Sequence, residues 1–171
     1  KGGSGFVVIC LQQSLKQHDS PVPVTTKLQY FRSTSSNGRR SAAASCLNGK
    51  LYVMGGCGAT SRYDPCTNVE FFDPSAKTWA AAASMGTARV GAAAATLHNK
   101  IYVMGGRRSG KYMNSVEMYD PTSGEKGTWT SVTNMKTARV LFAAATLNNA
   151  ADGDKLYVMG GMTPTSTASM E

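Results

Sequence analysis

The chain has 171 residues, a hydrophobic content of 42% and a formal net charge of +8. No apolar run approaches the ~20 residues of a membrane-spanning helix, and the sequence shows neither a signal-peptide core nor an Asn-x-Ser/Thr acceptor for glycosylation. These features argue against a membrane-spanning helix and predict a cytoplasmic domain without a membrane partner.

The N-terminal 38 residues match the rest of the chain poorly. Two short segments, residues 6–12 and 28–33, have the composition of strands. Tyr30 and Phe31 lie about ten residues before Arg39, the distance that separates a tryptophan from the next arginine further along the chain. We therefore interpret residues 1–38 as part of a repeat unit or as a linker.

From residue 39 onward the chain repeats itself. An apolar run followed by two glycines occurs three times, at residues 51–56, 101–106 and 156–161. The first two copies are 50 residues apart, and the third follows 55 residues after the second. Self-similarity at such a period is typical of solenoids and propellers, so it limits the fold before any single residue is considered.

Other residues recur in step with the glycine pair. Each unit opens with an arginine and an alanine-rich stretch, and in the first two units an aromatic residue and a tryptophan come after the glycines. We assign a structural role in the repeat to the glycines and to the aromatic residues. The repeated positions are Arg39, Arg89 and Arg139; Gly55, Gly56, Gly105, Gly106, Gly160 and Gly161; Phe72 and Tyr119; and Trp79 and Trp129.

Each unit is predicted to form four short strands. The alanine-rich stretch gives a strand of small side chains, suited to an axis where sheets converge, and the apolar run gives a strand buried on both faces. A Val-Glu segment that stops at Asp-Pro and the tryptophan segment supply the other two. Four strands per repeat without a helical period predict an all-β fold of antiparallel sheets around an axis, with aromatic rings packed between sheets.

These residues resemble the kelch motif, an apolar run and Gly-Gly followed by a spaced Tyr and Trp. The resemblance covers residues 39–171, with Phe72 where the family usually has Tyr. It implies a β-propeller segment with four-stranded antiparallel blades, about three in number, two complete and two partial at the ends. The implied repeats are residues 39–88, 89–138 and 139–171, of which the last is truncated in its third strand.

About three blades are too few to close a propeller, which has about four to eight. The open first and last blades therefore need an explanation. We favour a fragment of a longer protein, since the chain begins at Lys1 without methionine. The alternative is a homodimer that closes one six-bladed ring, in which the N-terminal segment of each chain completes the last blade of its partner.

The resemblance implies a protein-binding module. Kelch domains most often recruit substrates in cullin-based ubiquitin ligases, joined to a BTB domain, and the short units here resemble that branch. Actin or cytoskeletal scaffolding is a second family use. A third, an oxidase or epimerase, is not expected, because the copper-radical oxidases need two histidine ligands and this chain has only the distant His18 and His98. We expect no enzyme, no metal and no cofactor.

The basic charge indicates a protein or acidic peptide as partner. In peptide-binding kelch domains, the loop after the second strand and the entrance of each blade line one mouth of the channel, where arginines fork onto carboxylates. By this resemblance, the candidate partner-binding residues are Arg107, Arg108, Lys111 and Tyr112 behind the middle glycine pair, and Arg40, Arg89 and Arg139 at the blade entrances.

Alternatives remain open for these residues. The strictly repeated arginines, Arg39, Arg89 and Arg139, also suit a scaffold role in which they bind backbone carbonyls between blades. Arg107 and Arg108 do not recur, so for them partner contact competes with simple solvation. Nucleic acid is disfavoured, because the basic residues form no stripe and are not interleaved with aromatic residues.

The four cysteines show no metal-type spacing. Cys46 lies in the alanine-rich strand and is predicted to be buried. Cys57 and Cys66 share one loop, where free thiols are favoured over a disulfide or a redox pair. His98 lies in a hairpin turn, where we expect it to be exposed and inert.

Overall fold

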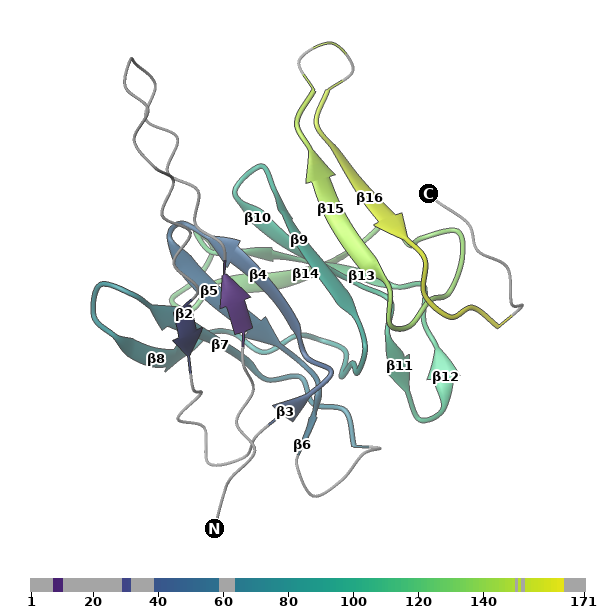
Figure 1. Cartoon of the computed structure of the whole chain (residues 1–171), viewed down its shortest axis with the longest axis horizontal. Helices are drawn as coiled ribbons and strands as arrows, with labels where there is room; N and C mark the ends of the chain where they lie inside the picture. Colours follow the sequence, from purple (N-terminus) through teal and green to yellow (C-terminus); the bar gives the residue numbers. More distant parts are fainter. Residues whose placement is uncertain are drawn as a thin grey trace.

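The computed structural model describes residues 8–10, 29–31, 39–58, 64–149, 151 and 153–164. Every regular element in this part of the chain is a β-strand, and the strands gather into antiparallel sheets (Figure 1). The predicted all-β architecture with four-stranded antiparallel sheets is therefore confirmed. The two-chain ring stays a prediction.

Two four-stranded sheets carry the repeat, and in each the strand order follows the chain. Blade 1 consists of β4 (Ala43–Leu47), β5 (Lys50–Met54), β7 (Val69–Asp73) and β8 (Thr78–Ala81). Blade 2 consists of β9 (Ala93–Leu97), β10 (Lys100–Met104), β13 (Val116–Asp120) and β14 (Thr128–Val132). Each predicted strand of these two repeats is thus present, in the predicted order.

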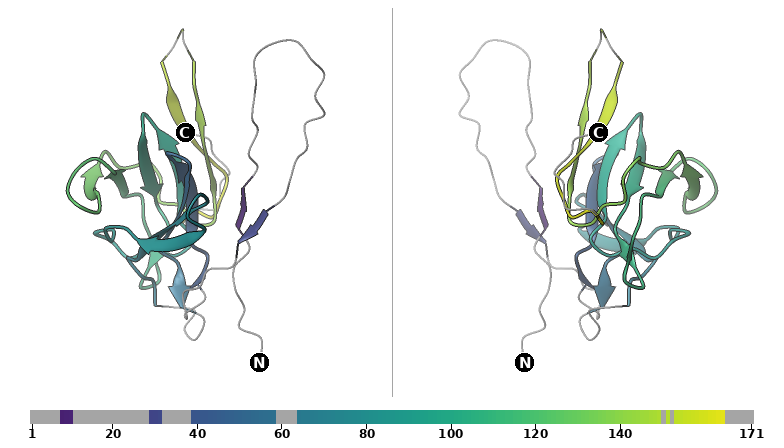
Figure 2. Two further views of the ribbon diagram at one scale, coloured as in Figure 1. Left: turned by 90° about the vertical axis from the view of Figure 1, so that its left-hand side faces the viewer. Right: turned by 90° about the vertical axis from the view of Figure 1, so that its right-hand side faces the viewer.

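Blade 3 is described over its first two strands, β15 (Ala143–Leu147) and β16 (Lys155–Met159), which pair antiparallel. Residues 148–154 join them, whereas turns of two residues join the matching strands of blades 1 and 2. The two described strands of this hairpin lie beside blade 2 (Figures 1 and 2). The third strand expected to end at Glu171 lies outside the described residues.

The N-terminal segment contributes a two-stranded antiparallel sheet of β1 (Val8–Cys10) and β2 (Gln29–Phe31). The strands expected within residues 6–12 and 28–33 are thus present over shorter spans. The remaining residues of the segment lie outside the described part of the chain, and its assignment as part of a blade stays a prediction.

The alanine-rich strands β4, β9 and β15 lie side by side, as expected for the innermost strands of adjacent blades (Figure 1). Their small side chains let the backbones approach closely enough for threonine hydroxyls to bridge them. Thr96 Oγ1 donates to the carbonyl of Cys46 at 2.7 Å, and Thr146 Oγ1 donates to the carbonyl of Thr96 at 2.7 Å. One hydrogen bond therefore recurs at each blade junction near the axis.

Aromatic rings join blade 1 to blade 2. Tyr119 lies between Tyr52 and Trp129, with ring centroids 5.6 and 5.1 Å away, and the indole N–H of Trp129 donates to the carbonyl of Ala83 at 2.8 Å. Burial, more than the neighbouring Tyr52, raises the pKa of Tyr119 to about 12, and its hydroxyl donates to the carbonyl of Lys126 at 2.7 Å. The rings pack one sheet on the next, as the repeat predicted.

Two cysteine predictions have different outcomes. Cys46 is exposed, so its predicted burial is wrong. Its neighbour Ser45 faces blade 2, where its hydroxyl lies 2.8 Å from Thr96 Oγ1, and strand alternation therefore turns Cys46 to the opposite face. Cys57 and Cys66 are present as thiols, the favoured alternative.

An ion pair links two strands at the rim of blade 2. Lys100 donates to Asp120, which also accepts hydrogen bonds from the backbone N–H and the hydroxyl of Thr122 at 3.0 and 2.7 Å. The hydrogen bond from Lys100 contributes most, and together these donors lower the pKa of Asp120 to about 2. In its ionised form, the carboxylate of Asp120 therefore holds the turn after β13.

The first prediction concerns the blade junction. Trp129→Ala should lower the free energy of unfolding by roughly 3–5 kcal/mol, because it removes a large packed ring and leaves the Ala83 carbonyl without its donor. Trp79→Ala is the matched control and should have the smaller effect, since Trp79 packs against Phe72 within blade 1, with the ring centroids 5.4 Å apart. Chemical denaturation measures both variants. Equal stability of Trp129→Ala and the wild type would show that the ring does not join the blades.

The second prediction concerns acid. The pKa of folded Asp120 lies below its ordinary value of 3.8, so the unfolded chain takes up the proton first as the pH falls. The stabilisation is complete above about pH 4 and is lost as the pH falls through about 2. Unfolding curves of Asp120→Asn should accordingly depend less on pH in this window than those of the wild type. Parallel pH profiles would contradict the assignment.

Candidate partner-binding site

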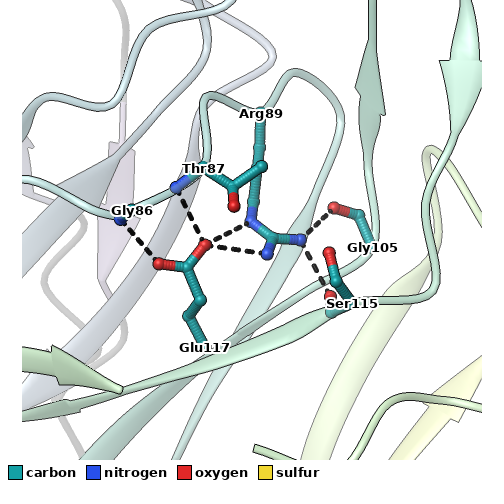
Figure 3. Close-up of polar contacts among 6 residues, drawn as sticks. All are labelled: Gly86, Thr87, Arg89, Gly105, Ser115 and Glu117. Atoms are coloured by element: carbon teal, nitrogen blue, oxygen red, sulfur yellow. Dashed lines mark hydrogen bonds and ion pairs between the residues drawn. The ribbon is translucent and has the colours of Figure 1, made fainter. Parts of the chain in front are cut away.

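The repeated arginines lie inside the fold. The side chain of Arg89 is fully buried, and its guanidinium donates to the carbonyls of Gly105 and Ser115, both at 2.8 Å (Figure 3). The same group pairs with Glu117 at 2.9 Å. Glu117 also accepts the backbone N–H groups of Gly86 at 2.6 Å and of Thr87 at 3.1 Å. Partners from both blades therefore compensate the buried charges of Arg89 and Glu117.

The same arrangement recurs in the neighbouring repeats. Arg39 pairs with Glu70 and donates to the carbonyl of Asn68 at 2.9 Å, and buried Arg139 donates to the carbonyl of Gly160 at 2.9 Å. The prediction that Arg89 and Arg139 bind a partner is therefore wrong, because neither guanidinium reaches the surface. The geometry supports the scaffold role that the sequence left open for them.

The glycine pair completes this junction from the other side. The backbone N–H of Gly56 donates to the carbonyl of Arg89 at 2.7 Å. A Cβ on Gly55 would lie only 2.7 Å from that carbonyl oxygen, so no side chain fits there. Gly55 also has a φ of 63°, which glycine adopts without strain. The predicted structural role of the glycines follows from this close approach.

Other candidate residues meet at one end of the blades, the mouth. Here β3 (Arg39–Arg40) pairs with β6 (Cys57–Gly58), and β11 (Arg107–Arg108) pairs with β12 (Lys111–Tyr112). Both pairs lie at the end opposite the hairpin tips (Figure 1). The β11–β12 hairpin turns through Ser109 and Gly110 at positive φ, as a tight two-residue turn requires.

The mouth holds a pocket of ≈ 360 Å³ that residues of all three blades line, and we name it the mouth pocket. Arg40 reaches it from blade 1, and Arg107 and Tyr112 reach it from blade 2. Arg108 and Lys111 instead line a neighbouring pocket of ≈ 460 Å³, which shares Tyr112 with the first. The structure thus brings five predicted residues to two adjoining pockets.

Apolar residues line the mouth pocket as well, and the sequence analysis missed them. They come from the entrance and from the glycine loop of blade 3 and include Val140, Leu141 and Met162. Leu141 is 62% exposed and Met162 is 53% exposed. The sequence does contain a signal for Leu141, because a large apolar residue stands there where the earlier units have Ser41 and Gly91.

Charge at the mouth differs from charge elsewhere. Ion pairs between described residues include those of the basic side chains of Arg39, Lys50, Arg89, His98 and Lys100. Arg107, Arg108 and Lys111 form no ion pair within this part of the chain. Positive charge therefore accumulates on one hairpin at the rim of both pockets.

The described residues contain no group of three or more His, Cys, Asp or Glu side chains that could hold a metal ion. His98 is exposed, as predicted, and lies 3.2 Å from Asp154 at the neighbouring hairpin tip. No helix within the described ranges is long and apolar enough to cross a membrane. The absence of a metal, a cofactor and an enzymatic activity stays a prediction.

The third prediction tests the buried arginine. Glu117→Ala should lower the free energy of unfolding by roughly 3–5 kcal/mol, because it leaves a buried guanidinium and two backbone N–H groups without their acceptor. Glu70→Ala is the matched control, since the side chains of Arg39 and Glu70 are 10% and 27% exposed and water can replace part of the lost contact. Urea unfolding of the two variants measures the difference. Equal losses would mean that burial does not govern this interaction.

Comparisons with known proteins agree with the architecture. The family model described as the Kelch motif matches residues 38–86 and 88–136, together more than half of the chain. The F-box/kelch-repeat protein At4g39580 of Arabidopsis thaliana is 43% identical over 54 residues, which are 30% of this chain and 13% of that protein.

A solved structure, that of YjhT, shares the fold. It is a kelch-type propeller that matches 86% of this chain with a TM-score of 0.63 at 15% identity. This chain spans 44% of YjhT and 13% of the F-box/kelch relative, so it corresponds to a part of each. With its repeated blades and its two matched motifs, the chain belongs to the kelch-repeat family, whose modules generally mediate protein–protein interactions.

Proposed function

We propose that this kelch module recognises an acidic segment of a partner protein at its mouth. The observation that carries the proposal is the meeting of Arg107 with Arg40 and Tyr112 at one pocket lined by three blades. A guanidinium donates two parallel hydrogen bonds to a carboxylate, and a phenol hydroxyl can donate a third. The pocket therefore offers donors suited to an Asp or Glu side chain.

The charge of the hairpin supports an acidic partner. Arg107, Arg108 and Lys111 find no carboxylate within the described residues, in contrast to the repeated arginines Arg39 and Arg89. The formal net charge of +8 adds a long-range attraction for acidic surfaces. Such a field increases the rate of association and makes binding sensitive to salt.

Two adjoining pockets suit a peptide segment. Arg107 faces the mouth pocket, while Arg108 and Lys111 line its neighbour, and Tyr112 contributes to both. Two acidic residues close together in one segment can each place a carboxylate at one pocket. We infer that the ligand carries two nearby acidic residues, one for each pocket.

We further propose that the module recruits substrates for a cullin-based ubiquitin ligase in the cytoplasm. One relative is an F-box/kelch-repeat protein, so a repeat similar to this one occurs there together with an F-box. The expected N-terminal BTB domain would serve the same purpose in a longer chain. Sequencing the transcript upstream of Lys1 tests this role, and a domain unrelated to ligases would reject it.

The fourth prediction tests the mouth directly. The immobilised protein is used to select from a displayed library of random peptides, and the most enriched peptide is titrated by fluorescence polarisation. We expect enrichment in Asp and Glu. Arg107→Glu combined with Arg108→Glu should weaken binding at least ~100-fold, since each substitution replaces an attraction by a repulsion. The melting temperature should stay within a few degrees, because neither side chain is part of the core.

The matched control changes the same charge elsewhere. Lys77→Glu combined with Lys155→Glu alters the net charge equally. Lys77 lies in the turn before β8 and Lys155 begins β16, and both are exposed and line neither pocket. This control should retain binding to within a few-fold. Equal losses of peptide affinity in both double variants would mean that only the net charge matters. Unchanged binding by the arginine variant would reject the site.

A further inference from the structure

The inference concerns the apolar half of the mouth pocket and rests on the proposed function. Leu141 and Met162 lie on the same pocket as Arg40 and Arg107. Both apolar side chains are more than half exposed. Large apolar side chains exposed together beside donors for a carboxylate are typical of a binding surface rather than of a solvated rim.

Leu141 is held in a conformation that leucine rarely adopts. Its φ is 56°, and its counterparts Ser41 and Gly91 have φ values of 51° and 66°. Hydrogen bonds between blades fix these three residues, since Gly91 N–H donates to Ser41 O at 2.9 Å and Leu141 N–H donates to Gly91 O at 2.8 Å. A bulky residue at this φ is a steric outlier, so the fold gives no reason to prefer leucine here over glycine or serine.

The side chain of Leu141 leans toward blade 2. A Cβ on Gly91 would lie 3.1 Å from Cδ2 of Leu141 and 2.7 Å from Cγ2 of Val140. The absence of a side chain at Gly91 therefore leaves room for leucine to lie across the entrance of blade 2. This direction brings its methyl groups into the pocket that Arg107 lines.

We propose that the mouth pocket takes a peptide residue with an apolar side chain next to an acidic residue. Leu141 and Met162 contact the apolar side chain, and Arg107, assisted by Arg40, binds the neighbouring carboxylate. The occupant is a peptide because the pocket combines an apolar surface with the positive charge of Arg107, which no carboxylate of the described residues neutralises. The ligand is thus an acidic segment interrupted by an aliphatic residue, and a uniformly acidic run would leave the apolar surface uncovered.

Three synthetic peptides with blocked ends test the two halves separately. Their cores are Glu-Leu-Glu, Glu-Ser-Glu and Gln-Leu-Gln, and binding to the whole chain is followed by NMR titration of its methyl groups. Burying one leucine side chain corresponds to a difference of roughly tenfold in affinity. We expect the Glu-Leu-Glu core to bind about tenfold more tightly than either of the others.

Variants assign the effect to Leu141. Leu141→Ser restores the residue found at the same place in blade 1, and Leu141→Gly restores that of blade 2. Both variants should fold. Both should bind Glu-Leu-Glu only as tightly as Glu-Ser-Glu, and their affinity for Glu-Ser-Glu should equal that of the wild type. Leu147→Ser is the control, because Leu147 is 54% exposed but does not line the pocket.

Each contrary result has its own meaning. Equal binding of the Glu-Leu-Glu and Glu-Ser-Glu cores would overturn the apolar half while leaving acidic recognition intact. Equal binding of Glu-Leu-Glu and Gln-Leu-Gln would overturn the carboxylate contact and the proposed function with it. Reduced thermal stability of Leu141→Ser and Leu141→Gly with unchanged peptide affinity would assign Leu141 to packing alone, which also overturns the inference. The absence of binding by all three peptides at millimolar concentration would reject it as well.

Discussion

The fold depends on one contact, the approach of an arginine backbone to the glycine pair of the preceding blade. The carbonyl of Arg89 accepts the N–H of Gly56 in blade 1, while its guanidinium binds two carbonyls and Glu117 in blade 2. One residue therefore holds two blades. A buried guanidinium is stable only when its donors are satisfied, and here the satisfying groups belong to the strands that it joins.

This junction determines what the mouth can present. Because the arginine is fixed, the second residue after it has the same backbone conformation in every unit, as the positive φ values of Ser41, Gly91 and Leu141 show. The side chain at this second position is not needed for the junction, and it differs between blades. Scaffold and recognition are thus separated by one or two positions along the chain, and Arg39 and Arg40 illustrate the change from a buried to an exposed arginine.

The blades were predictable from the sequence, because their spacing repeats in every unit, whereas the orientation of particular side chains was not. The recurrence of Arg89 and Arg139 favours a scaffold role without excluding a binding rim, and burial separates the two. Glu117 recurs in register with Glu70, which is a signal of a buried partner that could have been used. Cys46 was misplaced because an alanine-rich strand has no hydrophobic alternation from which its faces could be assigned.

The contrast between the arginines is what connects the architecture to binding. Arg39 and Arg89 each have a carboxylate partner supplied by their own blade, whereas Arg107 stands beside an apolar surface without one in the described part of the chain. Desolvating an unpaired guanidinium costs more than desolvating a paired one, so the pocket favours a ligand that supplies the missing charge. The same ligand must also cover Leu141, since the exposed leucine adds affinity only when water leaves it. Charge and apolar surface together therefore discriminate among acidic segments, which charge alone cannot do.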